Sequence, residues 1–422
     1  MRSLAVKKLY LETAPGQTRL GFFGSDDRLL DVWFDAWHRP NLMETVHNVR
    51  IERVFASQNR ATATLADGVA ISIRLRKSDA SLVKVGRILP VTIIAAPRHG
   101  KPWQAMLGAR LASAGMILLV GVADGASNIA LSNNIPSEDR AGLTARLLAE
   151  AGSELPSGFG VILRRGGSKL TDFTAPVSQL LKQWQDHANP IVADQTGCIY
   201  DSGGLLERAR RLFGDLPLID DPAEAATISA LLDDEIAAAC QPKTALSCGG
   251  NLWCAQSHAL WSIDLDGNGV TDFDRLFSEA AIEIPRQMRL RAMSGPVLVD
   301  LPRLAPAKVK KFRRALETAL GDDPRQPDCL GMTRGGLLEL QVPHGEMALH
   351  AVMQEQPAQD ALAGLRLVMQ QPPFKPVKLA VSRAMAAWLE GVGRPALDHL
   401  DRQVQLVVWS DDTHNQSAHI LG

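Results

Sequence analysis

The chain has 422 residues, of which 46% are hydrophobic and 22% are charged, as is usual for soluble globular proteins. A chain of this length divides into several domains, because single hydrophobic cores rarely grow beyond ~250–300 residues. With 45 basic and 46 acidic residues the net charge is -1, which excludes whole-molecule attraction to nucleic acid or to anionic membranes. Any binding of a polyanion must therefore come from a local basic patch.

The cysteines and the apolar runs point to the cytoplasm. The 5 cysteines are odd in number and show no CxxC spacing, so neither a disulfide framework nor a zinc motif is indicated. We interpret them as reduced thiols. The N-terminal residues lack an apolar core of signal-peptide length, and the most apolar run, GMILLVGVA, is too short to cross a bilayer. We expect a cytoplasmic protein without a membrane partner.

Short strands are expected first along the chain. Apolar and polar residues alternate in KLYLE, TRLGFFG and RLLDVWF within residues 1–40, and at least four short strands follow within residues 46–111. Their close spacing predicts a small barrel of the oligonucleotide-binding type. Next come a helix capped by Ser137 and stopped at Gly152, the strand GFGVILRR, and a helix over residues 175–187.

Two aspartates end successive strands in the second half of the chain. NLWCAQ and LWSID predict a strand pair that ends at Asp264. A helix follows, then the strand GPVLVD, which ends at Asp300, and then the helix KVKKFRRALETAL. In α/β arrangements of this order, ligands bind outside the carboxyl ends of parallel strands. We therefore expect the two carboxylates to share one cation.

The segment from Asp264 also has the spacing of the first half of a calcium-binding loop. An EF-hand loop needs oxygen ligands at positions 1, 3 and 5 and a bidentate glutamate at position 12. Asp264, Asp266 and Asn268 fit the first three positions, but position 12 is Arg275. A strand rather than a helix precedes the loop, so we favour the shared-cation site, and a calcium loop that only stabilises a domain stays as an alternative.

Positive charge is concentrated around Asp300, which is the only acid between residues 286 and 314. The cations in this segment are Arg286, Arg289, Arg291, Arg303, Lys308, Lys310, Lys311, Arg313 and Arg314. Phosphate backbones require such a patch, and a divalent ion held by two carboxylates activates water for phosphoryl chemistry. The alternative interpretation is that residues 308–314 form only the solvated face of a helix.

Taken in order, these segments resemble the ribonuclease E/G family of endoribonucleases. GGNLWCAQSHALWSID and EIPRQMRLRAMSGPVLVD resemble the segments that carry the family's two magnesium-binding aspartates, and TRGGLLEL resembles the strand that follows them. GFGVILRRGG resembles the strand of the family's RNA 5′-end sensor. The resemblance implies that Asp264 and Asp300 are catalytic and bind magnesium, with Asp266 in the place of an asparagine that orients the first aspartate. It implies hydrolysis within single-stranded RNA, in RNA processing or decay.

The resemblance also implies an α+β multidomain fold. The expected parts are a ribonuclease H-like subdomain (residues 1–40 and 204–246), an S1-like oligonucleotide-binding barrel (41–112), a 5′-sensor-like part (113–203), a deoxyribonuclease I-like α/β catalytic core (247–345) and a small C-terminal α/β domain (346–422). The residues expected to contact RNA are Lys101, Arg164, Arg165, Arg289, Arg291, Lys308, Lys310 and Lys311.

Several positions depart from the family pattern. Thr64 and Ile71 stand where the barrel presents aromatic residues for base stacking, and Arg165 replaces a threonine of the sensor. We expect Arg165 to occlude the phosphate pocket, and Pro285 to kink the helix between the aspartates. An RNA-binding protein of the same fold with weak or lost catalysis is therefore the alternative function.

The family's zinc link is missing as well. No cysteine follows the TRGGLLEL strand, and His344 and His350 alone cannot satisfy tetrahedral zinc. We expect no structural zinc and no zinc-linked tetramer. Self-association as a homodimer through the C-terminal domain stays open.

Overall fold

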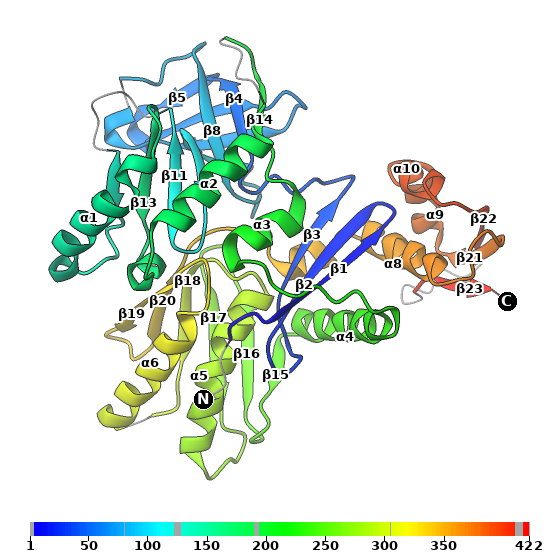
Figure 1. Cartoon of the computed structure of the whole chain (residues 1–422). Helices are drawn as coiled ribbons and strands as arrows, with labels where there is room; N and C mark the ends of the chain where they lie inside the picture. The colour runs from blue at the N-terminus through cyan, green and yellow to red at the C-terminus, as the bar shows by residue number, and fades with distance from the viewer. Residues whose placement is uncertain are drawn as a thin grey trace. The chain divides into compact units, whose positions relative to one another are not determined.

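The computed structural model describes residues 4–421 except 80, 122–127, 190–193, 304 and 410–416. It is a mixed α+β chain of several separate sheets (Figure 1). The chain forms two compact units, one of Met1–Ala5, Leu42–Leu216 and Lys243–Met347, the other of Val6–Asn41, Pro217–Pro242 and Ala348–Gly422. No helix among the described residues is both long and apolar enough to cross a membrane. The α+β class is as expected, and the finer division into six parts stays a prediction.

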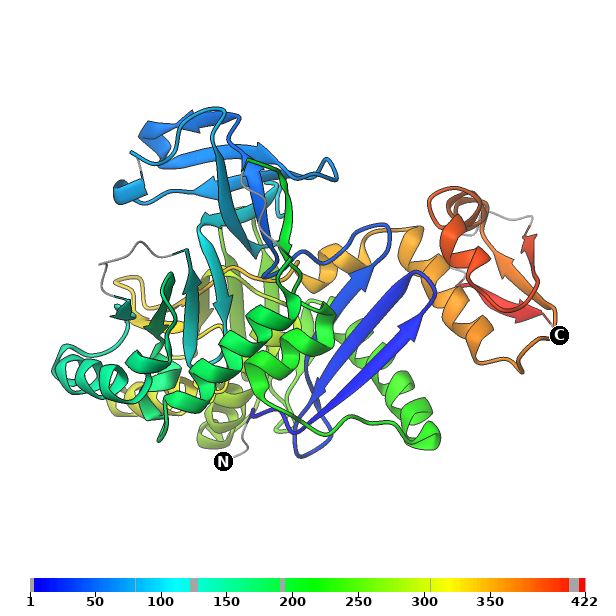
Figure 2. The same cartoon turned by 45° about the horizontal axis from the view of Figure 1, so that its top comes forward.

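The first sheet of the larger unit has seven strands in the order β14-β4-β8-β9-β7-β6-β5. These are β4 (Val46–Arg50), β5 (Arg53–Phe55), β6 (Arg60–Thr64), β7 (Ala70–Arg74), β8 (Ile88–Ala95), β9 (Trp103–Leu107) and β14 (Gly197–Tyr200). β4 and β5 follow each other closely in the chain, yet β4 pairs with β8 and β5 pairs with β6 at the opposite side of the sheet. The sheet is curved (blue in Figure 2). Trp103 and Ile71 are buried in the core of this sheet. Neither the Trp103 ring nor the Ile71 side chain can therefore stack on a base.

A four-stranded sheet follows, in the order β10-β11-β13-β12. It consists of β10 (Ala109–Ala112), β11 (Met116–Val120), β12 (Ile129–Leu131) and β13 (Phe159–Leu163), with α1 (Ser137–Ala151) and α2 (Thr174–His187) packed in the same core and α3 (Gly204–Phe213) after them. The expected N-cap is wrong by one position. Pro136 is the N-cap of α1, and the Ser137 hydroxyl donates to Glu138 instead of accepting from the helix backbone.

The third sheet carries both aspartates and has six strands in the order β15-β16-β17-β18-β20-β19. The strands are β15 (Lys243–Ala245), β16 (Asn251–Gln256), β17 (Trp261–Asp266), β18 (Gly295–Asp300), β19 (Asp328–Met332) and β20 (Leu338–Val342). Helices α5 (Phe273–Leu290) and α6 (Pro306–Leu320) lie side by side against one face of the sheet (Figure 1). α5 continues through Pro285, which is buried inside it.

The smaller unit contains two three-stranded sheets. β1 (Lys8–Ala14), β2 (Gln17–Phe23) and β3 (Leu29–Ala36) form an antiparallel meander, and α4 (Pro222–Cys240) belongs to the same unit. The C-terminal part combines β21 (Val377–Val381), β22 (Val404–Val408) and β23 (His419–Leu421) with α7 (Leu349–Met353), α8 (Ala358–Met369), α9 (Arg383–Glu390) and α10 (Arg394–Asp398). β21 is the central strand, parallel to β22 and antiparallel to β23.

Candidate active site

Asp264 and Asp300 are direct neighbours across two parallel strands. β17 and β18 pair in parallel, and in their register Asp264 lies opposite Asp300. Helix α5 makes the crossover between these strands, which is the connection that parallel pairing requires. Neighbouring strands lie about 4.8 Å apart. The two carboxylates therefore leave adjacent strands at the same level, near their carboxyl ends.

Both aspartates lie on the face of the sheet that the helices leave open. Along β17, Trp261, Ile263 and Leu265 are buried, while the residues between them, including Asp264 and Asp266, are exposed. Side chains of a strand alternate between its two faces, so the buried set packs under α5 and α6 and the aspartates point away from them. An extended polymer can therefore reach both carboxylates from solvent.

Asp264 lies close to two other carboxylates. The pKa of Asp264 is raised because its carboxyl is partly removed from water and because Asp300 and Asp266 are close to it. A divalent cation between the carboxylates would relieve this repulsion, and magnesium is commonly held by one or two carboxylates while keeping several waters. In the part of the chain that the structure describes, no group of three or more His, Cys, Asp or Glu is arranged to hold a metal ion. The two paired carboxylates, Asp264 and Asp300, are donors of the kind that magnesium takes.

The segment after Asp264 forms a turn and a helix cap. The Asp266 carboxylate accepts from the backbone N–H of Asn268 at 2.9 Å, and Asn268 has a positive φ of 44°. Asp272 is the N-cap of α5 and accepts from the backbone N–H of Arg275. Position 12 of the supposed calcium loop is therefore inside a capped helix turn. Asp266 fixes the end of β17, directly beside Asp264.

Comparison with known proteins agrees with this geometry. The model of the ribonuclease E/G family matches residues 220–342, the segment that contains both aspartates and the sheet that holds them. This segment is similar to the ribonuclease E/G family. Ribonuclease E of Escherichia coli (strain K12) is 26% identical over 255 residues, which cover 50% of this chain and 24% of that protein. The match thus spans about a quarter of the length of this relative.

Two arginines that were expected to bind RNA are buried. Arg289 is only 1% exposed and Arg291 only 5%. Arg289 Nη1 donates to the backbone carbonyl of Leu4 at 2.9 Å, and Arg291 donates to Gln287 and Thr244. A side chain without surface cannot contact a phosphate, so the expectation that these two arginines contact RNA is wrong. They hold the end of α5 in place.

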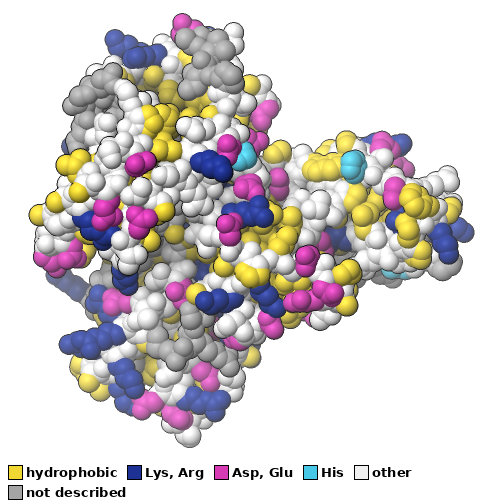
Figure 3. All heavy atoms as spheres, viewed as in Figure 1, with side chains coloured by type: hydrophobic (Ala, Val, Ile, Leu, Met, Phe, Trp, Pro, Cys, Tyr) yellow, Lys and Arg dark blue, Asp and Glu magenta, His cyan; other side chains and the backbone are white. Residues whose placement is uncertain are grey.

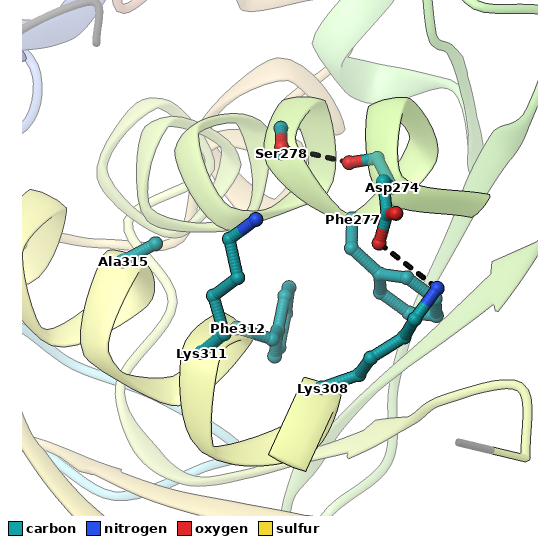
Figure 4. A pocket seen from close by; sticks show the side chains of 7 residues that line it. All are labelled: Asp274, Phe277, Ser278, Lys308, Lys311, Phe312 and Ala315. Carbon is teal, nitrogen blue, oxygen red and sulfur yellow. Dashed lines mark hydrogen bonds and ion pairs between the residues drawn. The ribbon is translucent and has the colours of Figure 1, made fainter. Parts of the chain in front are cut away.

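The lysines of α6 lie at the surface, but one of them is already paired. Lys308 Nζ lies 3.0 Å from Asp274 on α5, and Lys311 lies over the hollow between the two helices beside Phe312 (Figure 4). Lys310 is exposed. Lys and Arg side chains gather over α6 in the space-filling view (Figure 3). The surface of α6 therefore carries a basic patch, but this patch has fewer available cations than the sequence suggests.

Lys101 lies at the other end of the aspartate strands. Partial burial together with the charges of Arg98, Lys101 and Arg74 lowers the pKa of His344 to about 4. The His344 ring in turn lies against Gly295, the first residue of β18. Gly295 and Asp300 are the two ends of β18, roughly 16 Å apart at ~3.3 Å per residue. Lys101 can therefore meet RNA only several ångströms away from the aspartate pair.

The two sensor arginines are engaged within the protein. Arg164 donates to the backbone carbonyls of Ser113 (2.8 Å) and Pro324 (3.0 Å). Arg165 Nη1 donates to the Asp328 carboxylate at 2.6 Å, and its Nη2 donates to the carbonyls of residues 326 and 327. The side chain of Asn134 also donates to Asp328. The Asp328 carboxylate thus already binds the Arg165 guanidinium, which a 5′-phosphate would need as its partner.

Two exposed residues beside the aspartates were not singled out from the sequence. Trp253 on β16 lies opposite Asp264 in the antiparallel register, and Lys243 on β15 lies opposite Trp253. The signal was present in NLWCAQ, where Trp253 stands between the apolar residues Leu252 and Cys254, both of which are buried. Period-two alternation together with the hairpin register places Trp253 on the aspartate face.

Proposed function

We propose that this chain is a magnesium-dependent endoribonuclease that cleaves single-stranded RNA. The observation that carries the proposal is the direct pairing of Asp264 with Asp300 on an open sheet face, with a raised Asp264 pKa. The match of residues 220–342 to the ribonuclease E/G family supports an endoribonuclease type of activity. Magnesium dependence and the single-stranded RNA substrate are the finer parts of the proposal.

In this proposal Asp264 and Asp300 hold the cation through one carboxylate each. Bound magnesium supplies a Lewis acid that polarises a phosphoryl oxygen and lowers the pKa of water. Asp266 keeps the end of β17 in a turn through the bond from Asn268, and so orients Asp264. The exposed face lets the RNA chain lie across the strands, and the cations of α6 add attraction for its phosphates.

The alternative is an RNA-binding protein of the same fold with weak catalysis. It is favoured by the two arginines expected to sense the 5′ end, which bind Asp328 and backbone carbonyls, and by the burial of Trp103 in the core of the seven-stranded sheet. Both features weaken the grip on RNA outside the aspartate face. Neither feature removes a metal ligand, so we favour the enzyme.

The deciding experiment is incubation of the pure protein with an internally labelled single-stranded RNA. We expect internal cleavage products with magnesium and none with excess chelator. RNA binding without products under either condition would support the alternative. If calcium but not magnesium raised the melting temperature, the loop after Asp264 would instead be a structural calcium site. Self-association through the C-terminal part, checked by sedimentation, remains a separate prediction.

A further inference from the structure

A large aromatic side chain lies exposed beside the aspartate pair. Trp253 has 43% of its surface exposed, although its neighbours Leu252 and Cys254 are buried. Tryptophan is highly buried on average in folded proteins. Strand alternation puts this indole on the same face of the sheet as Asp264 and Asp300.

Trp253 belongs to a row of side chains that crosses four strands. Lys243 lies opposite Trp253, Trp253 opposite Asp264, and Asp264 opposite Asp300. At about 4.8 Å between strands, the row is roughly 14 Å long. Lys243 Nζ lies 5.5 Å from the centre of the Trp253 ring, in cation–π contact. The row therefore runs from a cation through an aromatic ring to two carboxylates.

We propose that Trp253 is the stacking platform for the base next to the phosphate held at Asp264 and Asp300, and that Lys243 contacts the following phosphate. The proposal rests on the endoribonuclease function proposed above. Phosphates and bases alternate along a single RNA strand. The row has the aspartate pair for one phosphate, the Trp253 ring for a base and Lys243 for the next phosphate. Aromatic rings stack on any base, because every base has a π face. The barrel cannot supply this stacking through Trp103 or Ile71, since both are buried.

The first test measures binding of the full-length chain to a short labelled single-stranded RNA in the presence of chelator, so that no cleavage occurs. Trp253→Leu keeps an apolar strand residue but removes the ring, and should weaken binding about 5- to 150-fold, the equivalent of the ~1–3 kcal/mol of one stacked base. Trp253→Phe should lose much less. Trp37, which is 49% exposed in the other compact unit, provides the matched control, and Trp37→Leu should leave binding unchanged.

The second test locates the stacked base. An abasic nucleotide is placed at each position of the RNA in turn, and at one position beside the cleaved bond it should weaken binding to the wild type but not further to Trp253→Leu. Binding by Trp253→Leu within twofold of the wild type, with a melting temperature that shows it folded, would overturn the proposal. So would additive losses at every abasic position. If Trp253→Leu does not fold, Trp253→Val, which also keeps an apolar strand residue without the ring, takes its place in the same cycle.

The two proposals fail in different ways. A wild-type protein that neither binds nor cleaves the RNA overturns the endoribonuclease function and the stacking platform together. A wild-type protein that cleaves, with a Trp253→Leu variant of unchanged KM and affinity, overturns only the platform. Weaker binding at an unchanged kcat supports the platform and leaves the catalytic role of the aspartates as it stands.

Discussion

Replacing Asp328 by alanine should give this protein a preference for RNA with a 5′-monophosphate. In the structure the Asp328 carboxylate is already bound by Arg165 (2.6 Å) and by the side chain of Asn134 (3.3 Å). A terminal monophosphate carries about -1.5 to -2 charge and would compete with Asp328 for the same donors. Arg164 adds little, because its guanidinium donates to the carbonyls of Ser113 and Pro324.

The geometry sets the size of the effect. The Arg165–Asp328 pair is partly open to water, with 40% and 35% of the two side chains exposed, so it contributes only about 0.2–1 kcal/mol. A phosphate that meets an uncompensated arginine gains about 1.5–3 kcal/mol per charged hydrogen bond. We expect the wild type to prefer monophosphate by less than about tenfold, equivalent to ~1.4 kcal/mol, and Asp328→Ala to exceed that ratio.

The assay compares kcat/KM on one RNA that carries either a 5′-monophosphate or a 5′-hydroxyl. Asp328→Asn keeps the shape of the side chain and loses its charge, so it should raise the ratio as well. Asp139→Ala removes another acid, in the first turn of α1, and should leave the ratio unchanged. A wild-type ratio well above tenfold would refute the reasoning, as would unchanged ratios in both Asp328 variants.

Three further predictions concern charged residues on and near the sheet that carries Asp264 and Asp300. Alanine at all three α6 lysines should lower the slope of log binding constant against log salt by about 1.4, at about 0.7 for each of two phosphate contacts, because Lys308 already pairs with Asp274. An unchanged slope would make α6 only a solvated face. Asp264→Asn should raise the melting temperature at pH 7 without divalent ions. The pKa of Asp264 is higher in the folded protein than in the unfolded chain, so the stability of the wild type falls as the pH rises through the folded pKa. The gain in melting temperature should therefore vanish at low pH, where Asp264 is protonated. A lower melting temperature of the variant at pH 7 would contradict this. Arg289→Ala should cost about 3–5 kcal/mol in urea unfolding, since it leaves buried partners unpaired, without changing the salt slope; a flattened slope in a stable variant would return Arg289 to the RNA surface.

The elements around the site could be predicted because local pattern decides them. Alternating burial marks β17 and β18, and the helix between them is the crossover connection that a parallel pair needs. The exact pairing of Asp264 with Asp300 comes from the register of the two strands, because Asp264 lies two residues before the end of β17 whereas Asp300 ends β18. The family resemblance predicted from the sequence is confirmed by the match over residues 220–342.

The engaged arginines could not be predicted because their partners are distant in sequence. Arg289 donates to the carbonyl of Leu4, 285 positions away, and Arg165 pairs with Asp328, 163 positions away. A run of cations in a sequence carries no sign of which members are buried, so the basic segment was interpreted as one surface. Trp253 was missed for the opposite reason, since its exposure follows from alternation alone, but tryptophan is usually assigned to the core.

The most direct test of the central claim is cleavage of one labelled single-stranded RNA by the wild type and by Asp264→Asn and Asp300→Asn, with magnesium and with chelator. The wild type should cleave within the chain only with magnesium. Both variants should fold and bind the RNA yet show no magnesium-dependent products, because each lacks one of the two paired carboxylates. Cleavage at the parental rate by either variant would contradict the assignment of the two aspartates as the catalytic pair.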